Sequence, residues 1–230
     1  MIHFYGTVTP NVQKVAILLE ELGLPHVRHR VDTEHGMQRE PEFLAINPNG
    51  KVPAITERGG DALPALMLWE SGAILCHLAE REGRFLPSEA SARAAVMQWL
   101  MWQVSALGPT GGQLAYFGRH CPVKLPIVIE RFGQELHRQL AVLDHALAER
   151  DFIAGCYSIA DMAIYPWWLA VCNVPMLSRR FSRARGLPWF LNLVRRQAPA
   201  YPHLHAWGQR MGARPAVKRG MAAFATHTPV

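Results

Sequence analysis

The chain has 230 residues, half of them apolar and 18% charged, a composition that excludes a disordered protein and allows one large or two small domains. The longest apolar stretches, such as residues 164–171, are far too short to span a membrane, and the first residues, Met-Ile-His-Phe-Tyr, do not have the pattern of a signal peptide. We therefore expect a cytoplasmic protein without membrane contact.

The net charge of +6 suits a small anionic ligand. The arginines in residues 179–185 have no nucleic-acid motif beside them, so we expect a solvated helical face and no nucleic-acid partner.

The first 82 residues alternate between strand and helix patterns. Apolar residues from Val12 to Leu22 recur at helical spacing, and Gly23 with Pro25 just beyond it ends that helix. The predicted elements, in chain order, are a strand at 2–5, a helix at 12–22, a strand at 27–31, a short helix at 41–46, strands at 52–56 and 66–68, and a helix at 71–81. This β-α-β-α-β-β-α order is that of a thioredoxin-like domain.

The remainder of the chain is helical in pattern. Residues 83–90, with Pro87 among them, form the expected linker, and an earlier helix is expected to end near Gly108-Pro109. A regular i, i+4, i+7 apolar stripe follows between Phe132 and Leu147. We therefore predict an α/β domain at residues 1–82, a linker at 83–90 and an all-α helical bundle at 91–230.

The cysteines limit the possible chemistry. They are widely spaced, with no C-x-x-C and no zinc-ligand pairing, and they stand at Cys76, Cys121, Cys156 and Cys172. The pair His203-x-His205 has no further ligands close by, so we expect no metal site. Any thiol chemistry must then use a sulfur that the ligand brings.

Val52-Pro53 comes just before a predicted strand, where a proline cannot donate to the sheet. A cis peptide bond would turn the N–H and C=O of Val52 outward, where they could pair with an extended peptide ligand. The alternative is an ordinary turn. The position of the pair between the β-α-β unit and Glu70-Ser71 favours the cis bond.

Glu70-Ser71 lies where a predicted strand meets a helix. The hydroxyl and backbone N–H of Ser71 would be exposed at the positive end of the helix dipole, which suits a carboxylate, and Glu70 can pair with an ammonium group. Together the two residues would recognise an α-amino acid head, such as the γ-glutamyl end of glutathione. A plain helix cap is the alternative, although capping does not require the acidic residue.

Thr9-Pro10-Asn11 lies between the first strand and the first helix. A hydroxyl and an amide meet a helix N-terminus there, an arrangement that lowers the pKa of a nearby thiol. The alternative is that either side chain only caps the helix.

Three other conspicuous features are expected to be structural. Tyr5 fits a role within its strand, because aromatic residues favour strands. Ser158-x-x-Asp161 is a capping box at the start of a helix, and Trp167-Trp168 is expected in a core or domain interface.

The chain resembles bacterial glutathione transferases of the nu class, also called glutathione disulfide-bond oxidoreductases. The resemblance covers nearly the whole chain, and two of its motifs, V-P-A-I and E-S-G-A, mark glutathione transferases broadly. The first segments that carry it are Thr9-Pro10-Asn11 and Gln38 with the following residues 41–44. The others are residues 47–55, 70–75, 98–104, Ile129-Glu130-Arg131-Phe132, 157–161 and 214–220. One departure is Met176 to Pro199, which is longer and richer in arginine than the family's usual run, so the shape of the outer pocket is left open.

The resemblance implies roles for individual residues. Thr9 and Asn11 would flank the glutathione sulfur and act as the catalytic pair. Arg131 would reach the site from the helical domain, and the other residues implied to hold glutathione are Gln38, Lys51, Val52, Pro53, Glu70 and Ser71. The family also implies a homodimer, and a site that takes one or two glutathione molecules or glutathione disulfide.

We therefore predict a glutathione-dependent disulfide reductase whose thiolate belongs to bound glutathione. Two alternatives remain. The first is conjugation of glutathione to an electrophile in an apolar outer pocket lined by Trp102, Tyr116 or Phe117. The second is a transferase-like module that binds partners and catalyses nothing. The sequence does not identify the physiological disulfide or electrophile.

Overall fold

The structure is a computed structural model that describes residues 1–57, 66–172 and 201–225. It forms two compact units, one made of Met1–Val96 with Gly212–Val230 and the other of Met97–Met211. The arginine cluster at 179–185 and the segment Met176 to Pro199 lie outside the described residues. The predicted division into domains at 1–82 and 91–230 remains a prediction, and the compact units follow different bounds.

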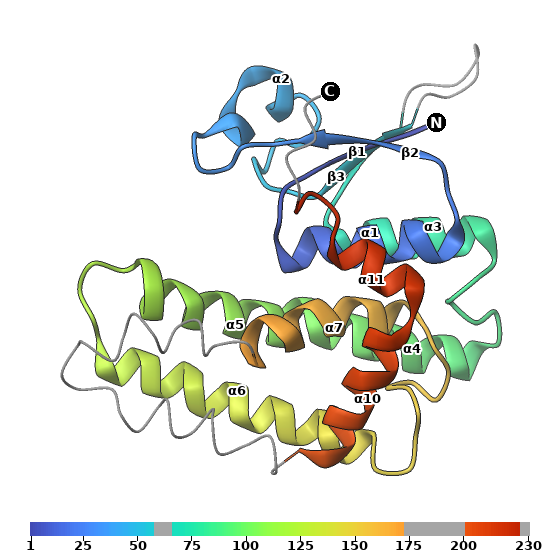
Figure 1. The fold of residues 1–230 in the computed structure, drawn as a ribbon, viewed down its shortest axis with the longest axis vertical. Helices are drawn as coiled ribbons and strands as arrows, with labels where there is room; N and C mark the ends of the chain where they lie inside the picture. The colour runs from blue at the N-terminus through green and yellow to red at the C-terminus, as the bar shows by residue number, and fades with distance from the viewer. Residues whose placement is uncertain (58–65, 173–200, 226–230) are drawn as a thin grey trace. The chain divides into compact units, whose positions relative to one another are not determined.

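The first unit is built on a sheet with strand order β2-β1-β3-β4 (Figure 1). The strand β1 pairs in parallel with β2 and antiparallel with β3, and β3 pairs antiparallel with β4. The elements of this unit are β1 (Ile2–Gly6), α1 (Pro10–Leu22), β2 (His26–Arg30), the short 3-10 helix η1 (Met37–Arg39), α2 (Pro41–Leu44), β3 (Ala54–Glu57), β4 (Leu66–Trp69), α3 (Ser71–Glu82) and α11 (Pro215–Met221). The predicted thioredoxin-like order of strands and helices is confirmed.

The helix α1 begins and ends where the sequence predicts. Thr9 is its N-cap, with the hydroxyl accepting the Val12 N–H at 3.3 Å, and Pro10 occupies the first turn, where no backbone donor is needed. Gly23 ends the helix in the left-handed conformation at φ 69°, which a glycine adopts without steric cost.

The two faces of the sheet are covered differently. The helices α1 and α3 lie on one face and α2 on the other (Figure 1). On α1 a nearly continuous buried run extends from Val12 through Leu19, apart from the half-buried Gln13. On the opposite face Phe43 packs with Val31 and Ala54.

The C-terminal segment belongs to the first unit because α11 packs on α1. A Cβ added at Gly220 would lie 2.6 Å from the backbone of Ile17, so only a glycine allows this close approach. Gln13 Nε2 donates to the carbonyl of Met221 at 3.1 Å. Contacts between residues about 200 positions apart in the chain leave no local pattern in the sequence.

The second unit is helical, as predicted. Its helices are α4 (Ala90–Trp102, which begins in the first unit), the π-helical segment η2 (Gln103–Leu107), α5 (Gly108–Ala115), the π-helical segment η3 (Tyr116–His120), α6 (Pro126–Ala146), α7 (Ile159–Cys172) and α10 (Pro202–Ala213). The prediction that a helix ends near Gly108-Pro109 is wrong. Helical backbone continues because η2 changes the hydrogen-bond register, so that Pro109 falls in the first turn of α5, where its missing N–H is not needed.

Two structural predictions for the second unit are confirmed. Trp168 is buried, with its ring centroid 5.7 Å from that of Trp207, and a Cβ at Gly208 would lie 2.0 Å from the Trp168 ring. Asp161 accepts hydrogen bonds from the backbone N–H of Ser158 at 3.1 Å and from its hydroxyl at 3.2 Å. These contacts tie the start of α7 to its own preceding loop.

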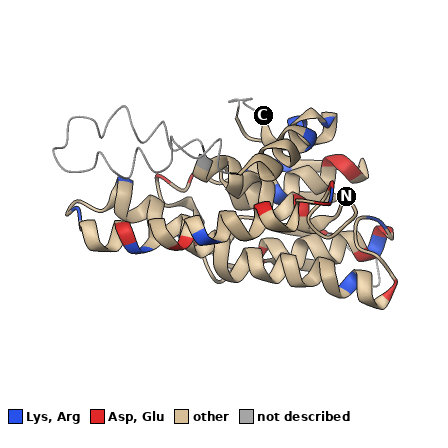
Figure 2. Cartoon of the chain, turned by 90° about the horizontal axis from the view of Figure 1, so that it is seen from below, with Lys and Arg blue, Asp and Glu red and all other residues tan. Residues whose placement is uncertain are grey.

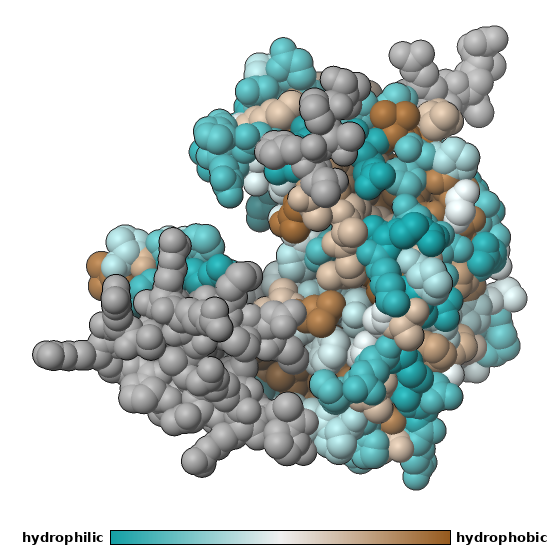
Figure 3. Space-filling view, in the orientation of Figure 1, coloured by the Kyte–Doolittle hydropathy of each residue, from teal (hydrophilic) through white to brown (hydrophobic). Residues whose placement is uncertain are grey.

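The described surface is mixed in character. Basic and acidic residues are interspersed along the described helices (Figure 2). Hydrophilic side chains predominate on the face seen in Figure 3, with apolar ones scattered between them. None of the helices in the described ranges is long and apolar enough to cross a membrane.

Candidate functional site

The register of the sheet brings the predicted site segments to one edge. Tyr5 at the end of β1 is opposite Ala54 at the start of β3, and Ala54 is opposite Trp69 at the end of β4. The segments that follow or precede these three residues must therefore lie at the same edge of the sheet. They are Thr9-Pro10-Asn11, Val52-Pro53 and Glu70-Ser71.

Gln38 lies in η1, which follows β2 in the chain. The Val31 N–H donates to the Gly6 carbonyl at 2.9 Å, and this hydrogen bond holds the end of β2 beside the end of β1, at the same edge of the sheet. The Gln38 side chain donates from Nε2 to the Thr33 carbonyl at 3.3 Å. Its Oε1 is buried and accepts no hydrogen bond from any described residue, so an acceptor is available there.

The Val52-Pro53 peptide bond is cis, as predicted. The segment is held in place by Asn47, which is 2% exposed and donates from Nδ2 to the Lys51 carbonyl at 2.5 Å. Asn47 Oδ1 also accepts the Asn49 N–H at 2.9 Å. We did not predict Asn47 as a site residue. Its asparagine side chain in a turn beside Val52-Pro53 was the signal that could have identified it.

Thr9 takes the capping role, and its hydroxyl keeps a hydrogen for the other role that the sequence left open. Its hydroxyl accepts the Val12 N–H, which makes it the helix cap. A hydroxyl that accepts one hydrogen bond still carries its own hydrogen, which can be donated to a thiolate. Asn11 follows in the first turn of α1 and is half-buried. Both side chains therefore lie at the positive end of the α1 dipole.

Glu70 and Ser71 form the start of α3. Glu70 is exposed and has a φ of 69°, a left-handed conformation that costs about 1–3 kcal/mol for a residue other than glycine. Ser71 differs from the expectation of an exposed hydroxyl, because it is only 6% exposed. Its Oγ accepts a hydrogen bond from Lys14 Nζ at 3.3 Å. The backbone strain at Glu70 is consistent with a side chain retained for a ligand.

Lys14 is a second residue of this edge that sequence reasoning missed. It lies on α1 among apolar neighbours and is 1% exposed. Burial lowers the pKa of its ammonium group to about 7, while the charge of Glu70 acts in the opposite direction. The signal was a lysine inside the apolar stretch that ends at Leu19, in a helix whose other charged residues, Glu20 and Glu21, come after that stretch.

The remaining predicted residues belong to the second unit. Arg131 lies on α6 and is exposed, and Trp102 is half-buried at the end of α4. Tyr116 is 50% exposed, and the neighbouring Phe117 ring stacks on Phe132 with centroids 6.2 Å apart. These three aromatic residues and Arg131 have the exposure that their predicted roles require, and those roles remain predictions.

Tyr5 and Cys76 take ordinary structural positions. The Tyr5 ring stacks on His29, with centroids 4.7 Å apart, and meets Phe43 edge-on. Cys76 is half-buried on α3, and burial raises the pKa of its thiol. Neither residue has the environment of an activated nucleophile.

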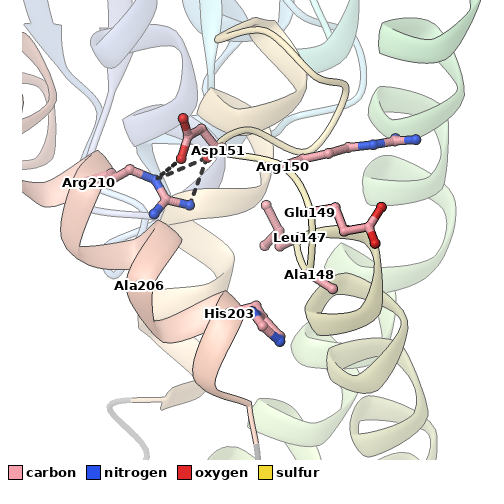
Figure 4. Close-up of a pocket in the computed structure, with 8 residues that line it drawn as sticks. All are labelled: Leu147, Ala148, Glu149, Arg150, Asp151, His203, Ala206 and Arg210. Atoms are coloured by element: carbon pink, nitrogen blue, oxygen red, sulfur yellow. Dashed lines mark hydrogen bonds and ion pairs between the residues drawn. The ribbon is translucent and has the colours of Figure 1, made fainter.

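A separate cavity of about 290 Å³ lies in the second unit (Figure 4). Its lining comes from the segment directly after α6 and from α10, and none of the predicted site residues takes part. Arg210 is already engaged there by Asp151, donating to its carbonyl at 3.0 Å. Arg210 is therefore already paired within the protein.

Comparison with known proteins identifies the family. Residues 9–81 match the glutathione S-transferase N-terminal domain. Two relatives from Escherichia coli (strain K12) are the disulfide-bond oxidoreductases YghU and YfcG. The chain is 37% identical to YghU over 100% of its own length and 77% of that protein. It is 39% identical to YfcG over 96% of its own length and 94% of that protein. The chain belongs to the glutathione S-transferase family.

Solved structures of this family show the same fold. A member from Pseudomonas fluorescens, solved with two glutathione molecules bound, has a TM-score of 0.81 at 37% identity and covers 96% of this chain and 92% of its own. A glutathione transferase from Pseudomonas putida, solved with one glutathione disulfide per subunit, has a TM-score of 0.84 at 34% identity, covering 96% and 91%. The resemblance seen in the sequence is confirmed.

Proposed function

We propose that this glutathione transferase is a glutathione-dependent disulfide reductase. The observation that carries the proposal is the meeting of Thr9, Asn11, Val52-Pro53 and Glu70-Ser71 at one sheet edge, in a chain without a C-x-x-C motif. The relatives named disulfide-bond oxidoreductases support it. The protein itself supplies no sulfur to the reaction.

Glutathione would be held by its ends and along its backbone. Ser71 binds the α-carboxylate of the γ-glutamyl group and Glu70 binds its ammonium. The backbone of Val52 pairs with the extended tripeptide, and the unpaired Gln38 Oε1 accepts a hydrogen bond from it. Lys51 supplies positive charge for a carboxylate of the ligand. The relatives solved with two glutathiones or with glutathione disulfide support room for a second molecule.

The reaction proceeds by two thiol–disulfide exchanges. The thiolate of bound glutathione, stabilised by Thr9, Asn11 and the α1 dipole, attacks one sulfur of the substrate disulfide. The other substrate sulfur leaves as a thiolate, and a mixed disulfide with glutathione forms. A second glutathione thiolate attacks the glutathione sulfur of that mixed disulfide, which releases the substrate thiol and glutathione disulfide.

The direct test measures reduction of a small model disulfide by glutathione. Replacement of both Thr9 and Asn11 by alanine should lower kcat/KM about 100-fold, the scale expected when donors to a developing charge are removed. Thr7→Ala, a threonine of the same loop, is the matched control and should keep wild-type activity. Full activity in the double variant would show that the site is wrongly assigned.

Conjugation of glutathione to an electrophile is the second candidate. The half-exposed ring of Tyr116, beside Phe117, favours an apolar second substrate. Turnover of an aryl halide, compared with turnover of a disulfide by the same preparation, separates the two reactions. A non-catalytic module is tested by retention on immobilised glutathione, because the proposed enzyme must bind and such a module need not.

The assembly and location are also proposed. We expect a homodimer, as the family resemblance implies, and size-exclusion chromatography with light scattering would detect it. A cytoplasmic location suits the chemistry, because reduction of disulfides by glutathione requires a compartment that keeps glutathione reduced.

A further inference from the structure

Lys14 is a buried cation beside the proposed ligand-binding edge. It is 1% exposed, and its Nζ lies 3.3 Å from the Oγ of Ser71. Placing an ammonium group in a protein interior is costly unless opposite charge or hydrogen bonds compensate for the lost water. A helix that needed only to pack on α3 would be better served by an apolar side chain at this position.

The hydrogen bond between Lys14 and Ser71 has a fixed direction. An ammonium group carries only donors, so the Ser71 oxygen must be the acceptor while Lys14 is protonated. The hydroxyl hydrogen of Ser71 is then available to be donated elsewhere. The backbone N–H of Ser71, the first residue of α3, is a second donor that the helix itself does not use. The start of α3 is therefore a place for an acceptor, and a carboxylate is the best one.

The charges around Lys14 are consistent with this direction. Burial lowers its pKa to about 7, and the carboxylate of Glu70 raises it. Glu70 itself is exposed, where it can pair with a ligand ammonium. A ligand carboxylate at Ser71 would add a second negative charge close to Lys14 and favour its protonated form.

We propose that Lys14 is a positioning residue that makes this site selective for ligands with an α-carboxylate, by holding Ser71 as a hydrogen-bond donor and by supplying the buried counter-charge. The inference rests on the proposed function, because it takes the γ-glutamyl group to bind at Ser71. Selectivity for the γ-glutamyl end of the tripeptide would then depend on Lys14, a buried side chain that donates to Ser71.

The test compares three tripeptides on two proteins by calorimetry. The ligands are glutathione, 4-aminobutyryl-cysteinyl-glycine, which lacks the α-carboxylate, and glutaryl-cysteinyl-glycine, which lacks the α-amino group. The proteins are the wild type and Lys14→Met, which keeps the length and shape of the side chain. A hydrogen bond that involves a charged group sets the expected loss for glutathione at about tenfold or more.

The expected result is specific to one end of the ligand. Lys14→Met should weaken binding of the two ligands that keep the carboxylate at the γ-glutamyl end, glutathione and glutaryl-cysteinyl-glycine. It should leave the affinity for 4-aminobutyryl-cysteinyl-glycine unchanged. A substitution that only distorted the site would weaken all three alike, and that outcome overturns the proposal, as does an unchanged affinity for glutathione.

Failure of the proposed function has a different signature. If the wild type bound none of the three tripeptides, the glutathione site itself would be refuted, and the inference with it. Unaltered affinity for 4-aminobutyryl-cysteinyl-glycine also reports that the variant is folded. Should Lys14→Met not fold, Lys14→Gln is measured in the same way, since it can still donate to Ser71 but carries no charge. Because the counter-charge is lost, a loss confined to glutathione and glutaryl-cysteinyl-glycine is again expected, and an equal loss for all three overturns the proposal.

Discussion

Lys14 and Asp161 are both buried ionisable groups, but their surroundings differ. Asp161, which is 0% exposed, accepts hydrogen bonds from the Ile153 N–H, from Ser158 and from the Trp207 indole N–H at 2.9 Å. Its partners all lie in the second unit and fasten a loop, the start of α7 and α10 together. Lys14 instead contacts Ser71, at an edge where we propose that a ligand binds.

The difference shows that burial of a charge does not by itself indicate function. For both groups burial shifts the pKa toward the neutral form, to about 6 for Asp161 and about 7 for Lys14. What separates them is the residue at the other end of the hydrogen bond. Asp161 is bonded to backbone and core groups, whereas Lys14 is bonded to a serine at a helix start. We therefore expect Asp161 to govern stability and Lys14 to govern ligand selectivity.

Removal of Asp161 gives the largest expected effect. Asp161→Ala leaves the buried donors of Ile153, Ser158 and Trp207 without an acceptor, at about 1–3 kcal/mol each. We expect the free energy of unfolding, measured by denaturant titration, to fall by about 3–5 kcal/mol. Asp151→Ala removes an aspartate whose side chain is 77% exposed and should change it by less than about 0.5 kcal/mol. A similar small change for Asp161→Ala would contradict this account.

The pH dependence of the free energy of unfolding should distinguish Lys14 from an ordinary lysine. Above pH 7 the folded protein progressively loses the Lys14 proton, while the unfolded chain, with its ordinary lysine pKa of 10.5, still holds it up to about pH 10. The unfolded state then binds more protons, so stability rises with pH across this window. Relative to Lys14→Met, the wild type should gain on the order of 3 kcal/mol between pH 7 and 9.5. Parallel curves for the two proteins would show that Lys14 titrates normally.

The smallest effect concerns the backbone at Glu70. Its φ of 69° is easily adopted by glycine and strained for alanine, so Glu70→Gly should be about 1 kcal/mol more stable than Glu70→Ala. Both variants lose the carboxylate and should bind glutathione equally weakly. Ala73 is an exposed helical residue nearby, and Ala73→Gly should lower stability by about 0.5–1 kcal/mol. If Glu70→Gly also proved less stable than Glu70→Ala, the backbone at this residue would not be strained.

Local chemistry made much of the fold and site predictable. Thr9, Pro10 and Gly23 mark the ends of α1 by capping and backbone conformation alone. The cis bond at Val52-Pro53 followed from a proline at the start of a strand that lay in a predicted β-α-β context. Such features depend on residues close together in the chain, and the sequence displays them directly.

Long-range packing could not be predicted in the same way. In the sequence Lys14 is one more charged residue of a helix. Its hydrogen bond with Ser71, 57 positions away in the chain, is seen only in the folded structure. The return of α11 to α1 depends on the close approach of Gly220 to Ile17. The continuation of the helix through Pro109 depends on the π-helical register of η2, which no periodicity of side chains announces.

A crystal structure of the protein with glutathione disulfide would locate the reacting sulfurs. We expect a γ-glutamyl carboxylate on Ser71, its ammonium at Glu70, and one sulfur of the disulfide within hydrogen-bond distance of both Thr9 and Asn11. A glutathione disulfide whose sulfurs lay away from these two side chains, or against a cysteine of the protein, would contradict this expectation.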